Sequence, residues 1–181
     1  MDTEAMELFT SMLALATGAG ALVILVAAVL ARSVPAARTL IEAVRELGPW
    51  LIFAVSGGAM AGSLWFSEVA DFAPCKLCWY QRIALFSIAI ISLVAAIRRD
   101  RRIAPYTLAL AAAGVLVSTY HYLLEWFPQL ETSVCSVDVP CTSVWFRGFG
   151  FVSLALMAGL AGLFVIVVSS VLVAGEKSSP R

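Results

Sequence analysis

Four cysteines are the residues of this chain most able to carry out chemistry. Cys75 and Cys78 form a C-x-x-C pair, whereas Cys135 and Cys141 are separated by five residues. Two cysteine pairs are compatible with structural disulfides, with a zinc site of thiolate ligands, or with thiol–disulfide exchange. The compartment and the elements that carry the pairs decide among these three kinds of chemistry.

Two polar residues accompany the cysteines in otherwise apolar stretches. Arg82 follows Cys78 by four residues, so on a helix the two side chains share one face, about one turn apart. An arginine inside a membrane span is costly unless it reaches the interface or takes part in function, and both interpretations are open for Arg82. His121, the single histidine, stands in S-T-Y-H-Y-L-L-E-W and is either an interface residue or a functional one.

The composition indicates the kind of element that must position these residues. Of the 181 residues, 61% are hydrophobic and only 13% are charged, which is far from the balance of a soluble globular chain. The 12 basic and 12 acidic residues cancel, which argues against nucleic-acid binding through bulk positive charge. The sequence therefore predicts a small integral membrane protein of the all-α class.

Five apolar stretches reach the length of about 20 residues that a helix needs to cross a bilayer. They are residues 9–31, 49–67, 79–97, 105–124 and 149–173. The first has an acidic flank and is too long for the core of a signal peptide, so we expect it to be retained as a helix. Five transmembrane helices are therefore predicted.

Basic side chains predict the orientation of these helices. Nine of the 12 Lys and Arg residues fall in the first connector, the third connector and the C-terminal tail, which the positive-inside rule assigns to the cytoplasm. They are Arg32, Arg38, Arg45, Arg98, Arg99, Arg101, Arg102, Lys177 and Arg181. We expect a multi-pass protein of a bacterial cytoplasmic (inner) membrane, with its N-terminus outside and its C-terminus in the cytoplasm.

Two local patterns refine this topology. Within residues 38–47, one helical face is apolar, as in a short helix lying in the inner interface, although a solvated linker is nearly as compatible; its residues are Leu40, Ile41, Val44 and Leu47. Gly58 and Gly62 stand four residues apart in the second span, and we expect them to permit close contact between helices.

On this topology all four cysteines lie in the two outward connectors, where an oxidising space favours disulfide chemistry. Structural disulfides are a weak explanation, because a loop as short as Cys135 to Cys141 contributes only about 2.4 kcal/mol. A four-cysteine zinc site is weaker still, because its second pair has five intervening residues and zinc ligand pairs usually have two to four. Thiol–disulfide exchange is the favoured chemistry.

The position of the C-x-x-C pair supports this choice. Cys75 and Cys78 stand after Pro74 at the start of a predicted helix, where free backbone N–H groups and the helix dipole favour a thiolate. Arg82 and His121 are expected at similar depths below this pair. Two polar donors in an aromatic-rich layer would suit the carbonyl oxygens of a quinone dissolved in the bilayer.

Three motifs, P-C-K-L-C-W-Y-Q-R-I, Y-H-Y-L-L and C-S-V-D-V-P-C-T, resemble those of the DsbB family of quinone-linked thiol oxidoreductases. The chain is most similar to its BdbC branch, which has a short second loop. This resemblance covers about residues 49–173 and implies a four-helix transmembrane bundle with one cysteine pair in each outward loop. The implied organisation is an N-terminal transmembrane helix with its connector (1–48), the redox bundle (49–174) and a cytoplasmic tail (175–181).

The resemblance also implies a role for each cysteine. Cys78 would pass electrons to the quinone, and Cys75 would exchange with the second loop. Cys135 would meet a DsbA-like thiol oxidase, the partner that the family reoxidises, and Cys141 would link to Cys75. The implied function is a quinone-dependent enzyme that generates protein disulfides.

Arg82 and His121 match the family residues that lie near the quinone, which is ubiquinone or menaquinone. Two departures are visible. Gln81 occupies a position that is acidic in some DsbB proteins, and the helix at residues 9–31 is additional to the four-helix core.

Two rival functions are compatible with the sequence. A protein similar to vitamin-K-epoxide reductase also couples loop cysteines to a quinone, but there the loop pair precedes the C-x-x-C pair. A non-enzymatic membrane scaffold would carry two static disulfides instead.

Overall fold

The computed structural model describes residues 2–131, 135 and 139–178, and the side chains of residues 176–178 are not part of that description. The side chain of Lys177 and the whole of Arg181, two of the basic residues used above to predict orientation, lie outside the described residues. The same holds for most of the segment between Cys135 and Cys141.

Among the residues described, five helices are long and apolar enough to cross a membrane, so the chain is a multi-pass membrane protein of the all-α class, as predicted. Their bounds are α1 Thr3–Leu30, α2 Pro35–Glu68, α3 Lys76–Arg98, α4 Ala104–Trp126 and α5 Leu154–Ser178. A short 3-10 helix, η1, spans Pro128–Leu130.

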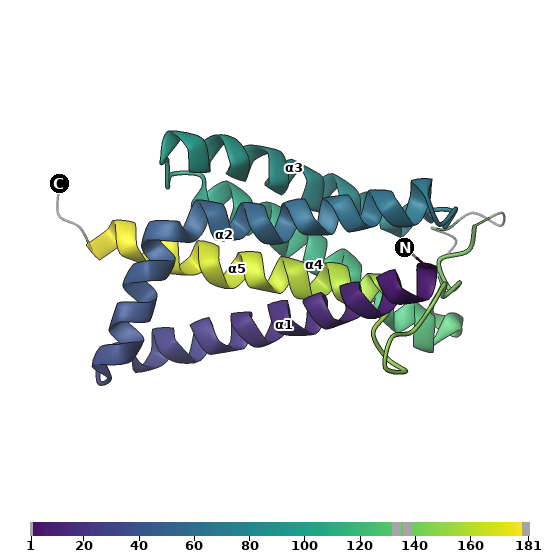
Figure 1. Ribbon diagram of the computed structural model, residues 1–181, viewed down its shortest axis with the longest axis horizontal. Helices are drawn as coiled ribbons and strands as arrows, with labels where there is room; N and C mark the ends of the chain where they lie inside the picture. The colour runs from purple at the N-terminus through teal and green to yellow at the C-terminus, as the bar shows by residue number, and fades with distance from the viewer. Residues whose placement is uncertain (1, 132–134, 136–138, 179–181) are drawn as a thin grey trace.

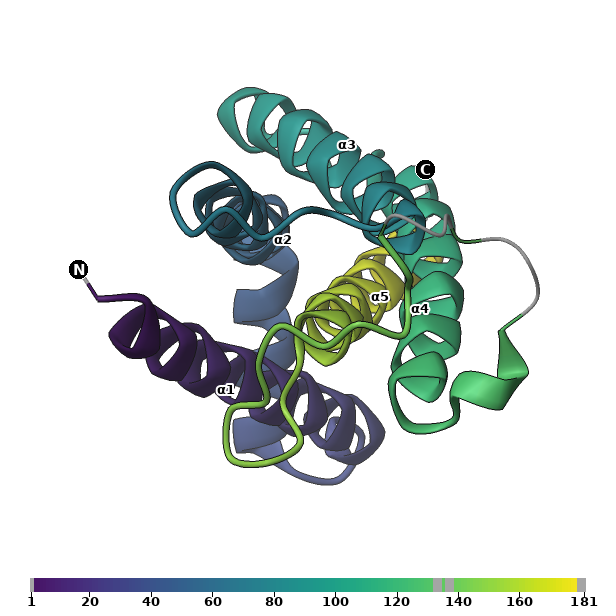
Figure 2. The same ribbon diagram turned by 90° about the vertical axis from the view of Figure 1, so that its right-hand side faces the viewer.

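The five helices run side by side, and Figure 1 shows the N-terminus and the two long connectors α2–α3 and α4–α5 at one end. The C-terminus and the connectors α1–α2 and α3–α4 lie at the other end (Figure 1). In the end view of Figure 2, α5 occupies the middle and the other helices surround it. Both cysteine-bearing connectors are therefore at the same end of the bundle.

Helix α2 begins earlier than the predicted span. The sequence suggested a separate connector helix within residues 38–47, but the structure has one helix over Pro35–Glu68, with Pro49 inside it. Figure 1 shows that the first part of α2 bends sharply from the long part, which agrees with the backbone hydrogen bond that an internal proline removes. Only part of the expected apolar face is buried, and it is buried in protein: Ile41 and Val44 lie in the main core, whereas Leu40 and Leu47 are exposed.

Helix α5 begins later than predicted. Residues from Phe149 were expected to be helical, but α5 starts at Leu154. Gly148 and Val152 form an isolated antiparallel bridge, with N–H···O distances of 2.9 and 2.8 Å. Phe149 and Gly150 turn the chain between them with positive φ angles of 54° and 83°. This tight turn ends the connector and sets the start of the last helix.

The core between the helices consists of small and branched apolar residues. Ile52, Ile88, Val165 and Val168 are fully buried within it. Helices α4 and α5 come especially close at Gly162, where an added Cβ would lie 2.7 Å from a methyl carbon of Val115. This contact fixes α5 against the helix that carries His121.

Candidate redox site

The C-x-x-C pair forms the start of helix α3. Cys75 is the N-cap residue, with extended backbone angles, and its sulfur accepts a hydrogen bond from the backbone N–H of Cys78 at 3.3 Å. The two sulfur atoms are 2.8 Å apart, and neither is joined to another cysteine. Cys75 is only 5% exposed, so the first sulfur is sheltered at the helix end. The expected position of the pair at a helix N-terminus is confirmed.

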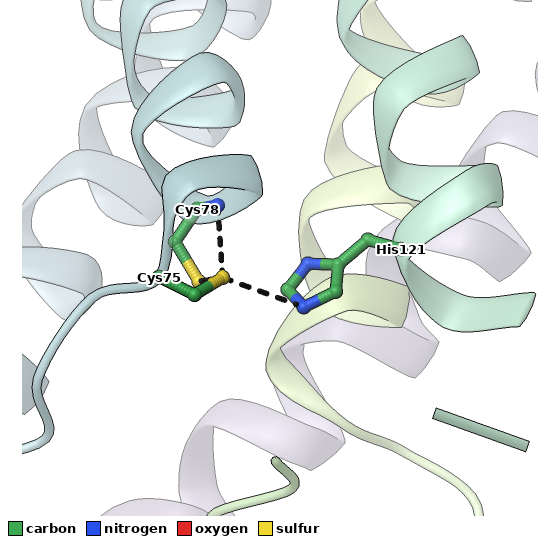
Figure 3. Close-up of side chains that lie close together, drawn as sticks. All are labelled: Cys75, Cys78 and His121. Atoms are coloured by element: carbon green, nitrogen blue, oxygen red, sulfur yellow. Dashed lines mark hydrogen bonds between the residues drawn. The ribbon is translucent and has the colours of Figure 1, made fainter. Parts of the chain in front are cut away.

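His121 of α4 approaches this pair from the opposite side (Figure 3). Its Nε2 lies 3.6 Å from the sulfur of Cys75, and its Nδ1 lies 3.2 Å from the amide nitrogen of Gln81. Because an amide nitrogen only donates, Nδ1 is the acceptor of that bond and the neutral ring carries its proton on Nε2. Gln81 therefore orients His121 so that it donates to the sulfur of Cys75.

Hydrogen bonds to its sulfur lower the pKa of Cys75, which precedes the membrane-spanning helix, to about 4. The bond from the thiol of Cys78 is the largest cause, burial opposes it, and the bond from His121 adds to it. An ordinary cysteine has a pKa of about 8.5. Cys75 is therefore a better leaving group than an ordinary cysteine, and at neutral pH it is a thiolate.

The alkylation of Cys75 is expected to be nearly independent of pH between 5 and 8. An ordinary thiol loses about tenfold in rate for each unit of pH below its pKa. The measurement is iodoacetamide labelling of Cys75, read by mass spectrometry, in protein whose loop cysteines are changed to serine. Cys78→Ser retains a hydroxyl donor and should keep the flat profile, whereas Cys78→Ala should restore a steep one. Equal profiles in these two variants would contradict the assigned cause.

The second cysteine pair is joined to itself and packs against the first. Cys135 and Cys141 form a disulfide with a Cα–Cα distance of 5.8 Å. Cys141 is fully buried in one cluster with Cys75, Leu77 and Leu124, and the partly buried Cys78 and Cys135 pack against that cluster. Residues about 60 positions apart in the sequence thus bring all four sulfur atoms to one place.

This arrangement is incompatible with the four-cysteine zinc site considered above, because the sulfur atoms of the disulfide are not available as thiolate ligands. The remaining donor set is Cys75, Cys78 and His121, whose ligand atoms all lie within 4.8 Å of one another. These three residues could hold a soft metal ion, but they are also the groups that a thiol–disulfide exchange site needs.

Aromatic stacking holds the two cysteine-bearing connectors together. Phe72 of the first connector stacks on Trp145 of the second at 4.7 Å between ring centroids and on Phe66 of α2 at 5.6 Å. Phe146 packs on Phe66 at 5.3 Å. Ring pairs of this kind each contribute about 0.5–1.5 kcal/mol beyond the area they bury. They fix the second connector over the start of α3.

Arg82 of α3 reaches the neighbouring helix α2. Its Nε donates to the hydroxyl oxygen of Ser63 at 3.0 Å, and its Nη2 donates to the backbone carbonyl of Ser63 at 2.9 Å. The guanidinium also lies 5.3 Å from the ring centroid of Trp79. A guanidinium has five N–H donors, so these two bonds orient it without using its full donor capacity.

A large apolar pocket of 350 Å³ opens beside this arginine. Cys78, Gln81, Arg82 and Ser63 supply sulfur or polar groups to its lining, whereas most other lining residues are apolar. His121 is not among the lining residues and instead lines a much smaller space beside Cys75 and Glu125. The structure thus brings His121 to Cys75 and Arg82 to the large pocket, in place of the shared site expected for the two side chains.

Three residues near the site were not singled out from the sequence. Ser63 is one serine in an apolar span, and only the fold identifies it as the partner of Arg82. Glu125 is 8% exposed and lies one helical turn after His121, while Arg147 donates to its backbone carbonyl at 2.8 Å. The signal available for Glu125 was its spacing of four residues from the only histidine.

The sequence of this chain is similar to those of known proteins. The family described as "Disulfide bond formation protein DsbB" matches residues 45–175. The chain belongs to the DsbB family. No solved structure gives a significant match.

The chain is also similar to several proteins described as disulfide formation proteins. It is 44% identical over 111 residues to a "Probable disulfide formation protein" of Oceanobacillus iheyensis, which covers 60% of this chain and 77% of that relative. It is 38% identical over 121 residues to "Disulfide bond formation protein C" of Bacillus subtilis, covering 66% of this chain and 87% of the relative. A "Probable disulfide formation protein C" of Halalkalibacterium halodurans is 37% identical over 132 residues, covering 72% of this chain and 93% of the relative.

These matches confirm the predicted resemblance to the DsbB family and to its C-type members. They also confirm the four-helix bundle with an additional helix, because the matched residues contain most of α2 and nearly all of α3 to α5, whereas α1 precedes them. A function in disulfide formation follows for this chain at the level of the family.

Proposed function

We propose that this DsbB-family chain reoxidises a DsbA-like thiol oxidase and passes the electrons to membrane quinone. The observation that carries the proposal is the packing of a loop disulfide and an unbonded C-x-x-C pair in one cluster beside a pocket that contains Arg82. The site would face the outer side of a bacterial cytoplasmic membrane, with the N-terminus on that side and the C-terminus in the cytoplasm.

The electron path uses ordinary thiol–disulfide exchange. The reduced partner, a dithiol, attacks the sulfur of Cys135 and leaves as a disulfide, which converts Cys135 and Cys141 to thiols. Cys141 then attacks the oxidised Cys75–Cys78 bond at Cys75 and releases Cys78 as a thiolate. Attack of Cys135 on Cys141 restores the loop disulfide and releases Cys75. Two electrons have then moved from the partner to the C-x-x-C pair.

The release of Cys75 is the step that His121 assists. A thiolate leaves faster when its pKa is low, and the Nε2–H of His121 directed at the sulfur stabilises that thiolate. Gln81 keeps the ring in the required tautomer through Nδ1. The predicted contact between His121 and a quinone is not needed for this role.

The residues of the large pocket fit a quinone. The pocket has a cationic donor, Arg82, beside the sulfur of Cys78 at one end and an apolar remainder, as a polar ring with an apolar tail requires. A bound quinone supplies a two-electron acceptor that takes up two protons. Arg82 would hold a ring oxygen, and Cys78 is the cysteine that lines the pocket.

A thiol count tests the proposal against a scaffold with two static disulfides. The protein is reduced without oxygen, freed of reductant and mixed with quinone, and its free thiols are then trapped with a membrane-impermeant reagent in sealed vesicles. We expect thiols that are labelled from outside before the addition to disappear within seconds after two equivalents of quinone, enough to oxidise both pairs. Thiols that persist, or that only opened vesicles expose, would refute the enzyme or its orientation.

A further inference from the structure

Helix α1 lies outside residues 45–175, the part of the chain that the family shares, yet it lines the large pocket. Thr10, Leu13, Ala14 and Thr17 of α1 all contribute to the lining. Figure 2 shows α1 on the side of α2 and α5, away from α3 and α4. The additional helix is therefore one wall of a space whose other walls come from the family bundle.

The pocket is long in the direction of the helices. On α2 its lining extends from Phe66 to Ala54, which is about 18 Å at 1.5 Å per residue. The sulfur of Cys78 and the guanidinium of Arg82 lie near the outer end of this length, and the lining becomes apolar below them. Space of this form suits a polar ring at the outer end and the first part of an apolar chain below it.

Small residues of α2 leave this space open. Gly58 was expected to permit close helix packing, but a Cβ added there would meet no atom within 4 Å, so that expectation is wrong for Gly58. A Cβ added at Gly62 would lie 3.9 Å from the methyl group of Thr10, an ordinary contact. Both glycines line the pocket: Gly58 borders free space, whereas Gly62 lies opposite Thr10 of α1 with room for one methyl group between them.

The surface that α1 presents to this space is effectively apolar. The hydroxyl of Thr17 donates to the backbone carbonyl of Leu13 at 2.8 Å, and that of Thr10 donates to the carbonyl of Met6 at 2.7 Å. Threonines bonded in this way direct no free donor at a ligand. Leu13 is 50% exposed and lies at the rim, so α1 also forms the edge of the pocket next to the lipid.

We propose that α1 is the tail-holding wall of the quinone site, enclosing the first isoprenoid units between its Thr10–Thr17 face and the Gly58–Gly62 face of α2. This inference rests on the proposed function. Without α1 that side of the pocket would be bounded by lipid. The additional helix thereby makes affinity depend on the tail as well as on the ring.

The test compares the binding of two quinones to full-length protein in nanodiscs, one with a long isoprenoid tail and one with only a methylated ring. Gly58→Leu places a side chain in free space, and Thr17→Phe enlarges the α1 wall. Ala16→Phe is the matched control, because Ala16 is the exposed neighbour of Thr17 and does not line the pocket. We expect the first two variants to weaken binding of the long-tailed quinone about tenfold and that of the tail-less quinone less than twofold, and the control to change neither.

Photolabelling gives an independent readout. A quinone with a diazirine on its first isoprenoid unit should label α1 within Thr10–Thr17 and α2 within Ala54–Ser63, as located by mass spectrometry. Label confined to other helices would overturn the inference, as would equal effects of Thr17→Phe and Ala16→Phe. If the wild type binds neither quinone, the proposed function fails; if it binds both and the variants do not distinguish them, only the role of α1 fails.

Discussion

Cys78→Ser is expected to reduce the rate of quinone reduction at least about 1000-fold, the loss typical when a reacting nucleophile is removed. Cys78 is the cysteine of the C-x-x-C pair that lines the large pocket, and without it the pair cannot form its own disulfide. The measurement is the loss of quinone absorbance in a single turnover of pre-reduced protein. The same variant should accumulate a Cys75–Cys141 bridge, because those residues pack in one buried cluster.

Cys135→Ser is the matched control, since it changes a loop cysteine and leaves the C-x-x-C pair intact. Pre-reduced Cys135→Ser protein should reduce quinone at a rate near that of the wild type. Its oxidation of a reduced DsbA-like partner should be lost, because Cys135 is the sulfur that the partner is proposed to attack. Wild-type oxidation of the partner by this variant would show that the assigned electron path is wrong.

The helices of this fold could be predicted because membrane spans are encoded locally. Long apolar runs gave all five helices, and the resemblance of three motifs gave the bundle. Helix ends were less predictable. Pro49 bends α2 but does not end its hydrogen bonding, and the turn at Phe149 and Gly150 depends on backbone angles that an apolar sequence does not reveal.

The candidate site was only partly predictable, because its contacts join distant parts of the chain. The four cysteines, Arg82 and His121 stood out by residue type and position. That His121 donates to Cys75 while Arg82 bonds Ser63 follows from how α3 packs between α2 and α4. The sequence positions of Arg82 and His121 are equally compatible with an arrangement in which both side chains contact one ligand.

The role of α1 was beyond the sequence for a related reason. An apolar helix outside the shared family segment carries no motif, and its pocket-facing threonines satisfy their hydroxyls within their own helix. The G-x-x-x-G spacing at Gly58 indicated close packing, because small residues at this spacing usually permit it. The same small residues also leave room for a ligand, and only the neighbouring helices decide which use applies.

Arg82→Met is expected to weaken quinone binding and to lower the rate of quinone reduction, together about 100-fold, the effect of removing one preorganised donor from a developing oxyanion. The change removes the only charged side chain that lines the pocket among the described residues and breaks both bonds to Ser63. Arg82→Lys retains the charge but loses the fork of N–H donors, so we expect a loss of about tenfold. Binding and single-turnover rates are measured on the same nanodisc samples.

Ser63→Ala tests how much the orientation of the Arg82 guanidinium contributes while the guanidinium itself is kept. The change removes only the side-chain acceptor and leaves the bond to the backbone carbonyl. We expect a loss of about threefold, because one of the two bonds that orient Arg82 persists. The pH profile of Cys75 alkylation should be unchanged in all three variants and serves as evidence that the site is intact. If Arg82→Met binds and reduces quinone as the wild type does, Arg82 is an interface anchor whose charge reaches the membrane surface, the alternative that its position near the N-terminal end of α3 allows.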